Sequence, residues 1–150
     1  MSENVELRRT QLATPASDPD FMESASRSDA DEVFLDLEDS VAPNAKVEAR
    51  QPLIEAVDEH DWSDKILSYR MNGIDTQWWY DDIIEVVGAV GEQIDDIIVP
   101  KVAGPSDIHT VENLLEQVEE NNGLEVGRIG LEPQIEDGDG IHNVYEIAHA

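Results

Sequence analysis

Charged side chains follow apolar segments of strand length, and their types are those of oxyanion and metal chemistry. Asp36 and Glu38 come at the end of one such segment, Arg70 closes the next, and Lys101 and Glu136 follow two later ones. In parallel α/β sheets the carboxyl ends of the strands meet at one edge, where active sites are built. We therefore expect these five side chains to converge.

Such a group could combine a divalent cation with a fixed positive charge. Mg²⁺ takes one or two carboxylates together with waters and substrate oxygens, so Glu136 with Asp36 or Glu38 could supply ligands. A fixed guanidinium can stabilise a developing oxyanion. The residues alone leave another interpretation open, because a chain with 35 acidic residues has carboxylates in any short window. Arg70 and Lys101 could then be ordinary ion-pair partners.

The elements that must position these residues alternate between strand and helix. Units of about 30 residues are typical of parallel strands joined by crossover helices. Asp18 and Ser106 are expected to cap two of the helices, and Pro52 either to kink another or to restart it. We predict strands at 9–13, 32–37, 66–71, 94–99 and 128–135, and helices at 18–27, 44–58, 78–90, 106–123 and 141–150.

Five strand–helix units fit either an open doubly wound sheet or most of a (β/α)8 barrel. The first strand is not followed by a glycine-rich phosphate-binding motif, which weakens the doubly wound alternative. A complete barrel takes about 250 residues. We therefore expect residues 1–150 to be the N-terminal portion of a single barrel domain, with about five of its eight units and without its C-terminal region.

The charge balance excludes several classes of partner. Nine Lys and Arg against 35 Asp and Glu give a formal net charge of −26, which repels nucleic acids and anionic membranes. No apolar run approaches the ~20 residues of a membrane span, and the first ten residues do not resemble a secretory signal. The absence of cysteine fits a cytoplasmic protein. Apolar blocks in so acidic a chain favour a folded domain adapted to multimolar salt, and the alternative is an ordinary acidic protein with a polyanion-like surface.

Four sequence blocks around the edge residues carry a family resemblance. They are DLEDSVAP at 36–43, RMNGIDTQWWY at 70–80, PKV at 100–102 and LEPQIEDGDG at 131–140. In this order they resemble the CitE/HpcH-type lyase superfamily, and among its branches the malyl-CoA/β-methylmalyl-CoA lyases. The resemblance extends over nearly the whole chain.

The resemblance implies a (β/α)8 barrel, usually a homo-oligomer, that uses Mg²⁺ or Mn²⁺ for reversible Claisen chemistry. Malyl-CoA or β-methylmalyl-CoA would be split into glyoxylate and acetyl-CoA or propionyl-CoA. Arg70 matches the residue that stabilises the substrate oxyanion, and Glu136 matches the first metal ligand. The second metal ligand and an acid–base Asp would lie beyond residue 150. Asp36 and Glu38 would line the pocket and hold Arg70 and metal-bound water.

Two further residues are assigned to substrate binding, and three departures bear on the CoA part of the substrate. Gln11 and Lys101 are expected to contact substrate. Relatives have Phe, Arg and Lys at CoA-contacting positions that align with Ala13, Asp18 and Ser24. This loss of cations favours one alternative, a paralogue acting on citramalyl-CoA or another hydroxy acid. A separate alternative is an inactive, truncated homologue.

Overall fold

A computed structural model describes residues 8–150, in which strands and helices alternate as predicted. The strands are β1 (Gln11–Pro15), β2 (Glu32–Asp36), β3 (Ile66–Arg70), β4 (Asp96–Val99) and β5 (Gly130–Pro133). The α-helices are α1 (Pro19–Ser26), α2 (Arg50–Glu59), α3 (Trp79–Val90), α4 (Pro105–Asn122), α5 (Gly138–His142) and α6 (Val144–Ile147), with a 3₁₀ turn at Pro43–Ala45.

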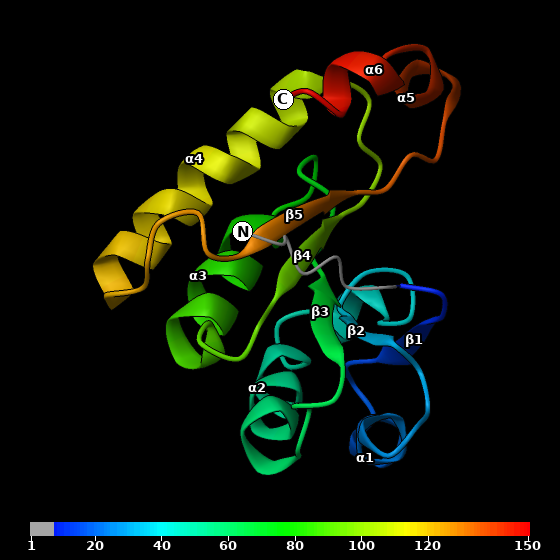
Figure 1. The fold of residues 1–150 in the computed structure, drawn as a ribbon, viewed down its shortest axis with the longest axis vertical. Coiled ribbons are helices and arrows are strands. Elements are labelled where there is room, and N and C mark those ends of the chain that lie inside the picture. The colour runs from blue at the N-terminus through cyan, green and yellow to red at the C-terminus, as the bar shows by residue number, and fades with distance from the viewer. Residues whose placement is uncertain (1–7) are drawn as a thin grey trace, which may run out of the picture.

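The strands form one parallel sheet in the order β1-β2-β3-β4-β5. Parallel crossovers are right-handed, so a sheet whose strands follow chain order carries its helices on one face. Figure 1 shows α1 to α4 along the outside of the curved sheet. This is the arrangement of consecutive units of a (β/α)8 barrel, and it confirms the predicted parallel α/β fold. A doubly wound sheet would reverse its strand order instead.

Alternate residues of the strands serve the two faces of the sheet. Leu35 and Tyr69 are fully buried in the apolar core between the sheet and the helices. Their neighbours point to the other face, since Ser68 donates to Glu32 across the β2–β3 pair and Arg70 lies over the Phe34 ring. The inner face of the curved sheet is therefore partly polar, and it bears the charged residues.

Several predicted boundaries were wrong. The helix predicted at 44–58 begins only at Arg50, because Pro52 is tolerated in the first helical turn but not farther inside. Ser106 is not a cap. Helix α4 starts one residue earlier, after Gly104, and the Asp107 carboxylate accepts from the Gly104 N–H at 3.2 Å. The helix predicted at 141–150 is replaced by the short helices α5 and α6.

Other end signals were confirmed. The Asp18 side chain accepts from backbone N–H groups at the start of α1, and Gly123 ends α4 in the left-handed region at φ 75°. The predicted bounds of the first strand were wrong. β1 spans Gln11–Pro15 instead of 9–13, and it can end on a proline because proline is tolerated on an edge strand.

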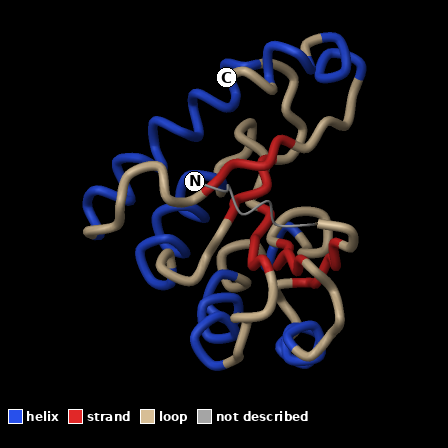
Figure 2. Tube along the Cα trace, viewed as in Figure 1, coloured by secondary structure: helices blue, strands red, loops and turns tan. Residues whose placement is uncertain are grey.

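The loops that leave the carboxyl ends of β2, β3, β4 and β5 lie at one end of the sheet (Figure 2). The four sequence blocks described above lie in these loops and in the residues that adjoin them. At the amino ends, turns of five to seven residues return the chain from helix to strand. None of the helices within residues 8–150 is both long and apolar enough to cross a bilayer.

Candidate active site

The centre of the candidate site is a forked ion pair between neighbouring strands. Asp36 and Arg70 end β2 and β3 and are partners in the sheet register. Arg70 Nε and Nη2 each donate to one oxygen of Asp36 at 2.8 Å. Arg70 is only 8% exposed and Asp36 2%. A bidentate pair with so little exposure fixes the plane of the guanidinium.

Asp36 is also held by the turn that follows it. Its two oxygens accept from the backbone N–H groups of Glu38, at 2.8 Å, and Ser40, at 2.9 Å. Burial alone would raise the pKa of Asp36, but the bonds from Arg70, Ser40 and the Glu38 N–H outweigh it and the pKa is lowered. The hydrogen bond that Arg70 donates to Asp36 likewise raises the pKa of Arg70, so the pair stays charged.

Glu38 lies between the two cations of the site. Its Oε1 accepts from Lys101 Nζ at 2.5 Å, and its Oε2 lies 3.4 Å from Arg70 Nη1. Oε2 is buried and has no hydrogen-bond partner among residues 8–150. The hydrogen bond that Lys101 donates to Glu38 raises the pKa of Lys101, whose side chain is 55% exposed. Glu38 thus holds the Lys101 ammonium at the solvent-exposed edge of the site.

Lys101 connects the site to Glu136 through its backbone. Its N–H donates to Glu136 Oε2 at 2.8 Å. Lys101 has φ 56°, in the left-handed region that non-glycine residues rarely adopt, and such strain is often found at functional sites. An open cavity of about 560 Å³ adjoins this contact, lined by Ile74, Asp75, Pro100, Lys101, Asp107, Glu136 and Asp137.

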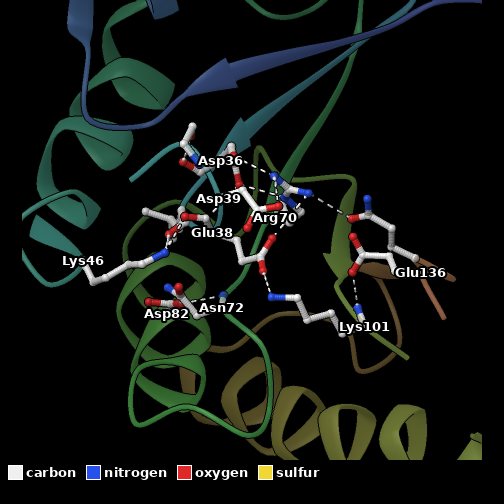
Figure 3. Close-up of polar contacts among 12 residues, drawn as sticks. Asp36, Glu38, Asp39, Lys46, Arg70, Asn72, Asp82, Lys101 and Glu136 are labelled. Atoms are coloured by element: carbon white, nitrogen blue, oxygen red, sulfur yellow. Dashed lines mark hydrogen bonds and ion pairs between the residues drawn. The ribbon is translucent and has the colours of Figure 1, made fainter. Parts of the chain in front are cut away.

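Figure 3 shows how the predicted residues meet: Asp36, Glu38, Arg70, Lys101 and Glu136 form one connected polar cluster. Sequence reasoning missed Gln134, whose Oε1 accepts from Arg70 Nη1 at 3.3 Å. Its signal in the sequence was its place directly after β5, which ends at Pro133, because the carboxyl ends of parallel strands meet at one edge of the sheet.

Gln11 is not brought to this cluster. It pairs with Glu32 at the amino end of β1, and its Nε2 donates to Glu32 at 2.9 Å and to Glu132 at 3.0 Å. Asp36 is paired with Pro15, four residues farther along the strand, or roughly 13 Å away. The structure therefore gives Gln11 a role in the polar amino end of the sheet interior.

A larger hollow of about 710 Å³ also lies at the amino ends of the strands. It is lined by Asp31, Gln93, Asp95 and most of the segment 57–66, without any residue of the forked pair. Because parallel sheets build their chemistry at the carboxyl ends, we place the candidate site at the smaller cavity.

The side chains near the cavity can supply few ligands to a metal ion. Glu136 is exposed, and only its Oε2 is engaged by a hydrogen bond within the described residues. Among residues 8–150, no group of three or more His, Asp or Glu side chains is placed to hold a metal alone. A single free carboxylate oxygen fits Mg²⁺, which needs few protein ligands, but it leaves most of the shell to other groups.

Residues 9–150 match the family model of the HpcH/HpaI aldolase/citrate lyases. The chain belongs to this family. It is 45% identical over 144 residues to the L-malyl-CoA/beta-methylmalyl-CoA lyase of Rhodobacter capsulatus, covering 96% of this chain and 45% of that protein. Citrate lyase subunit beta of Leuconostoc mesenteroides subsp. cremoris is 35% identical over 147 residues, covering 98% of this chain and 48% of that protein. This member of the family thus spans about half the length of these relatives.

Solved structures agree on the fold. A Haloferax volcanii malate synthase in a lead(II) complex superposes with a TM-score of 0.86 at 20% identity, covering 96% of this chain and 45% of that one. The CitE protein of Mycobacterium tuberculosis, in complex with magnesium and acetate, gives 0.70 at 24% identity, covering 97% and 52%. At these identities the two structures establish the shared fold of this aldolase/citrate lyase family member and nothing further.

Proposed function

We propose that the chain provides the amino-terminal part of a Mg²⁺-dependent carbon–carbon lyase that cleaves malyl-CoA or β-methylmalyl-CoA. The products would be glyoxylate and acetyl-CoA or propionyl-CoA. The observation that carries the proposal is the buried Asp36–Arg70 fork beside Lys101 and Glu136, in a chain 41–45% identical to relatives named for this activity.

Arg70 is the residue to which we assign oxyanion stabilisation. Cleavage of the carbon–carbon bond leaves an enolate on the acyl thioester, and a charge already in place lowers the barrier. Nε and Nη2 are taken by Asp36, whereas within residues 8–150 Nη1 has only the longer contacts to Gln134 and Glu38, at 3.3 and 3.4 Å. Nη1 is therefore the donor best able to exchange a protein contact for a substrate oxygen.

Asp36 and Glu38 keep this donor charged and oriented. Asp36 fixes the guanidinium plane through two parallel bonds, which a lysine could not reproduce. Glu38 holds the Lys101 ammonium, and we assign Lys101 to the substrate's carboxylate or thioester oxygen. Its half-exposed position at the cavity supports this role.

Glu136 is the proposed ligand for Mg²⁺, or for Mn²⁺ in its place. When bound, the cation would supply Lewis-acid polarisation of the hydroxy-acid oxygens. The Lys101 N–H holds Glu136 at the cavity through one oxygen and leaves the other available. The second metal ligand and the acid–base Asp are proposed to come from the part of the barrel that follows residue 150.

The acidic surface supports a cytoplasmic protein that works in multimolar salt, where screening removes the self-repulsion of a net charge of −26. We also propose a homo-oligomer, on the family resemblance alone.

The test is a chimera in which this chain replaces the matching part of the Rhodobacter capsulatus lyase. Glyoxylate release from malyl-CoA and β-methylmalyl-CoA would be measured over a range of KCl concentrations, with Mg²⁺ and then with EDTA. Release that EDTA abolishes supports the proposal, and the ratio of the two rates names the preferred substrate. A chimera that folds by circular dichroism but releases no glyoxylate refutes it.

A second candidate is a lyase for citramalyl-CoA or a hydroxy acid on another carrier. It is favoured by the residues at the expected CoA positions. Asp18 is occupied as the cap of α1, Ser24 Oγ donates to the Asp20 carbonyl at 2.9 Å, and Ala13 offers no polar group. None of the three carries a positive charge that could pair with a phosphate. Pyruvate release from citramalyl-CoA in the same chimera would select this candidate.

A further inference from the structure

Lys46 is a basic residue beside the site that the proposed reaction leaves without a role. It lies between the 3₁₀ turn and α2 and is only 7% exposed. Its Nζ donates to the Leu37 carbonyl at 2.9 Å and to the Glu38 carbonyl, and it lies 5.9 Å from the centre of the Trp78 ring. Figure 3 shows Lys46 and Lys101 reaching Glu38 from opposite sides.

These contacts complete the restraint of the Glu38 backbone. The N–H of Glu38 is held by Asp36 Oδ1 at 2.8 Å, and its carbonyl also accepts from the Val41 N–H at 3.1 Å. With the Leu37 carbonyl held as well, both peptide groups that flank the Glu38 Cα are fixed. Only side-chain rotation remains, and the carboxylate is then directed between Arg70 and Lys101.

The acidic surroundings favour a charged Lys46. Burial lowers the pKa of its ammonium, and the carboxylates of Glu38, Asp36, Asp82 and Asp39 oppose that shift. An ammonium that donates to two carbonyls makes charge-assisted bonds, which are stronger than bonds between neutral groups. A neutral side chain of the same length would leave the two carbonyls without this donor.

We propose that Lys46 is a positioning residue, which holds the 37–38 peptide so that Glu38 can orient Lys101 and Arg70. Its importance for turnover rests on the proposed function, whereas its hold on the loop does not. Lys46 would touch neither substrate nor metal, and it would act only through Glu38.

Lys65 provides a matched control. It is also a lysine with a buried side chain whose Nζ donates to a backbone carbonyl, that of Ser28, at 2.5 Å. It lies just before β3, at the opposite end of the sheet from the site. Lys65→Met therefore removes the same kind of bond without touching the Glu38 loop.

The first measurement is amide hydrogen exchange, by NMR, on the 150-residue chain. Lys46→Met should speed exchange of the Glu38, Ser40 and Val41 amides roughly tenfold or more, because a charge-assisted bond closing the loop is lost. The Leu37 amide, which donates to the Arg70 carbonyl in the sheet at 3.0 Å, should stay protected. Lys65→Met should leave all four amides unchanged.

A rescue experiment separates the loss of the Lys46 ammonium from general destabilisation of the fold. The chain has no cysteine, so Lys46→Cys introduces a single thiol. Aminoethylation of the unfolded chain restores an ammonium at nearly the length of lysine, and after refolding it should restore slow exchange. Alkylation with iodoacetamide, which adds no charge, should not.

In the lyase chimera, Lys46→Met should lower kcat at least roughly tenfold, with a smaller change in KM. The substrate contacts remain, but the charges of Arg70 and Lys101 are no longer oriented by Glu38. Unchanged exchange at the three loop amides, a uniform rise at all amides, or equal rescue by both reagents would overturn the positioning role. An unchanged kcat would overturn its importance for turnover. Because exchange needs no catalysis, it decides the positioning even if the chimera is inactive.

Discussion

The buried carboxylate of Asp82 provides a sharp test of how the loop after β3 is held. Asp82 is fully buried in the first turn of α3. It accepts from Arg50 Nε at 2.8 Å, and from the backbone N–H and side-chain amide of Asn72 at 2.9 and 2.7 Å. We expect Asp82→Asn to destabilise the chain strongly. The substitution removes the negative charge that neutralises Arg50, and it places an amide NH₂ group opposite the N–H donors of Arg50 or Asn72.

The contacts set the size of the effect. Breaking a buried ion pair from one side costs about 3–5 kcal/mol of unfolding free energy. Arg50 keeps its bonds to Glu85, at 2.9 Å, and to the Trp78 carbonyl, at 3.1 Å, so the lower end of that range applies. For a domain of this size about 3 kcal/mol corresponds to a fall in Tm of roughly 6–12 °C.

The assay is urea and thermal unfolding followed by circular dichroism in KCl of several concentrations. Asp81→Asn is the matched control, since it removes a carboxylate from the same helical turn, but one that is partly exposed and forms no hydrogen bond with the described part of the chain, residues 8–150. Asp81→Asn should lower the free energy of unfolding by less than about 1 kcal/mol. Salt should raise the stability of all forms but leave the Asp82→Asn deficit in place, because buried pairs are little screened. A deficit within about 1 kcal/mol of zero would refute the reasoning.

Three further outcomes are expected. In the chimera, Arg70→Lys should lower turnover roughly 100-fold without unfolding, because lysine cannot form both bonds to Asp36; near-normal turnover would remove Arg70 from the mechanism. Glu136→Gln should raise the Mg²⁺ concentration needed for half-maximal turnover, and an unchanged titration would show that Glu136 is not a ligand. The bond from Arg9 lowers the pKa of Asp31 to about 2. This stabilisation is complete above the unfolded pKa of about 4 and is lost as the pH falls through about 2. Asp31→Asn should therefore flatten the stability curve between about pH 5 and pH 2, as unfolding by circular dichroism would show, and a curve parallel to that of the parent chain would exclude this contribution.

Local patterns in the sequence were enough to predict the class of fold and which side chains gather at the candidate site. Apolar runs of strand length alternate with helical periodicity, and local propensity and periodicity need no knowledge of the partner strands. The charges that end the strands could then be placed at one edge, because all parallel strands present their carboxyl ends together. Asp36, Arg70, Glu38, Lys101 and Glu136 do meet there.

The register of the strands and the contacts between distant side chains depend on how the whole chain folds. Gln11 lies on a correctly predicted strand, yet its position at the amino end of β1 depends on pairing with Glu32, 21 residues away. The direction of the Lys46 ammonium depends likewise on how the turn after β2 folds back toward α2. Sequence spacing fixes which face of a strand a residue occupies. The height of that residue along the sheet and the partners of a long side chain are set by pairing and packing between distant segments.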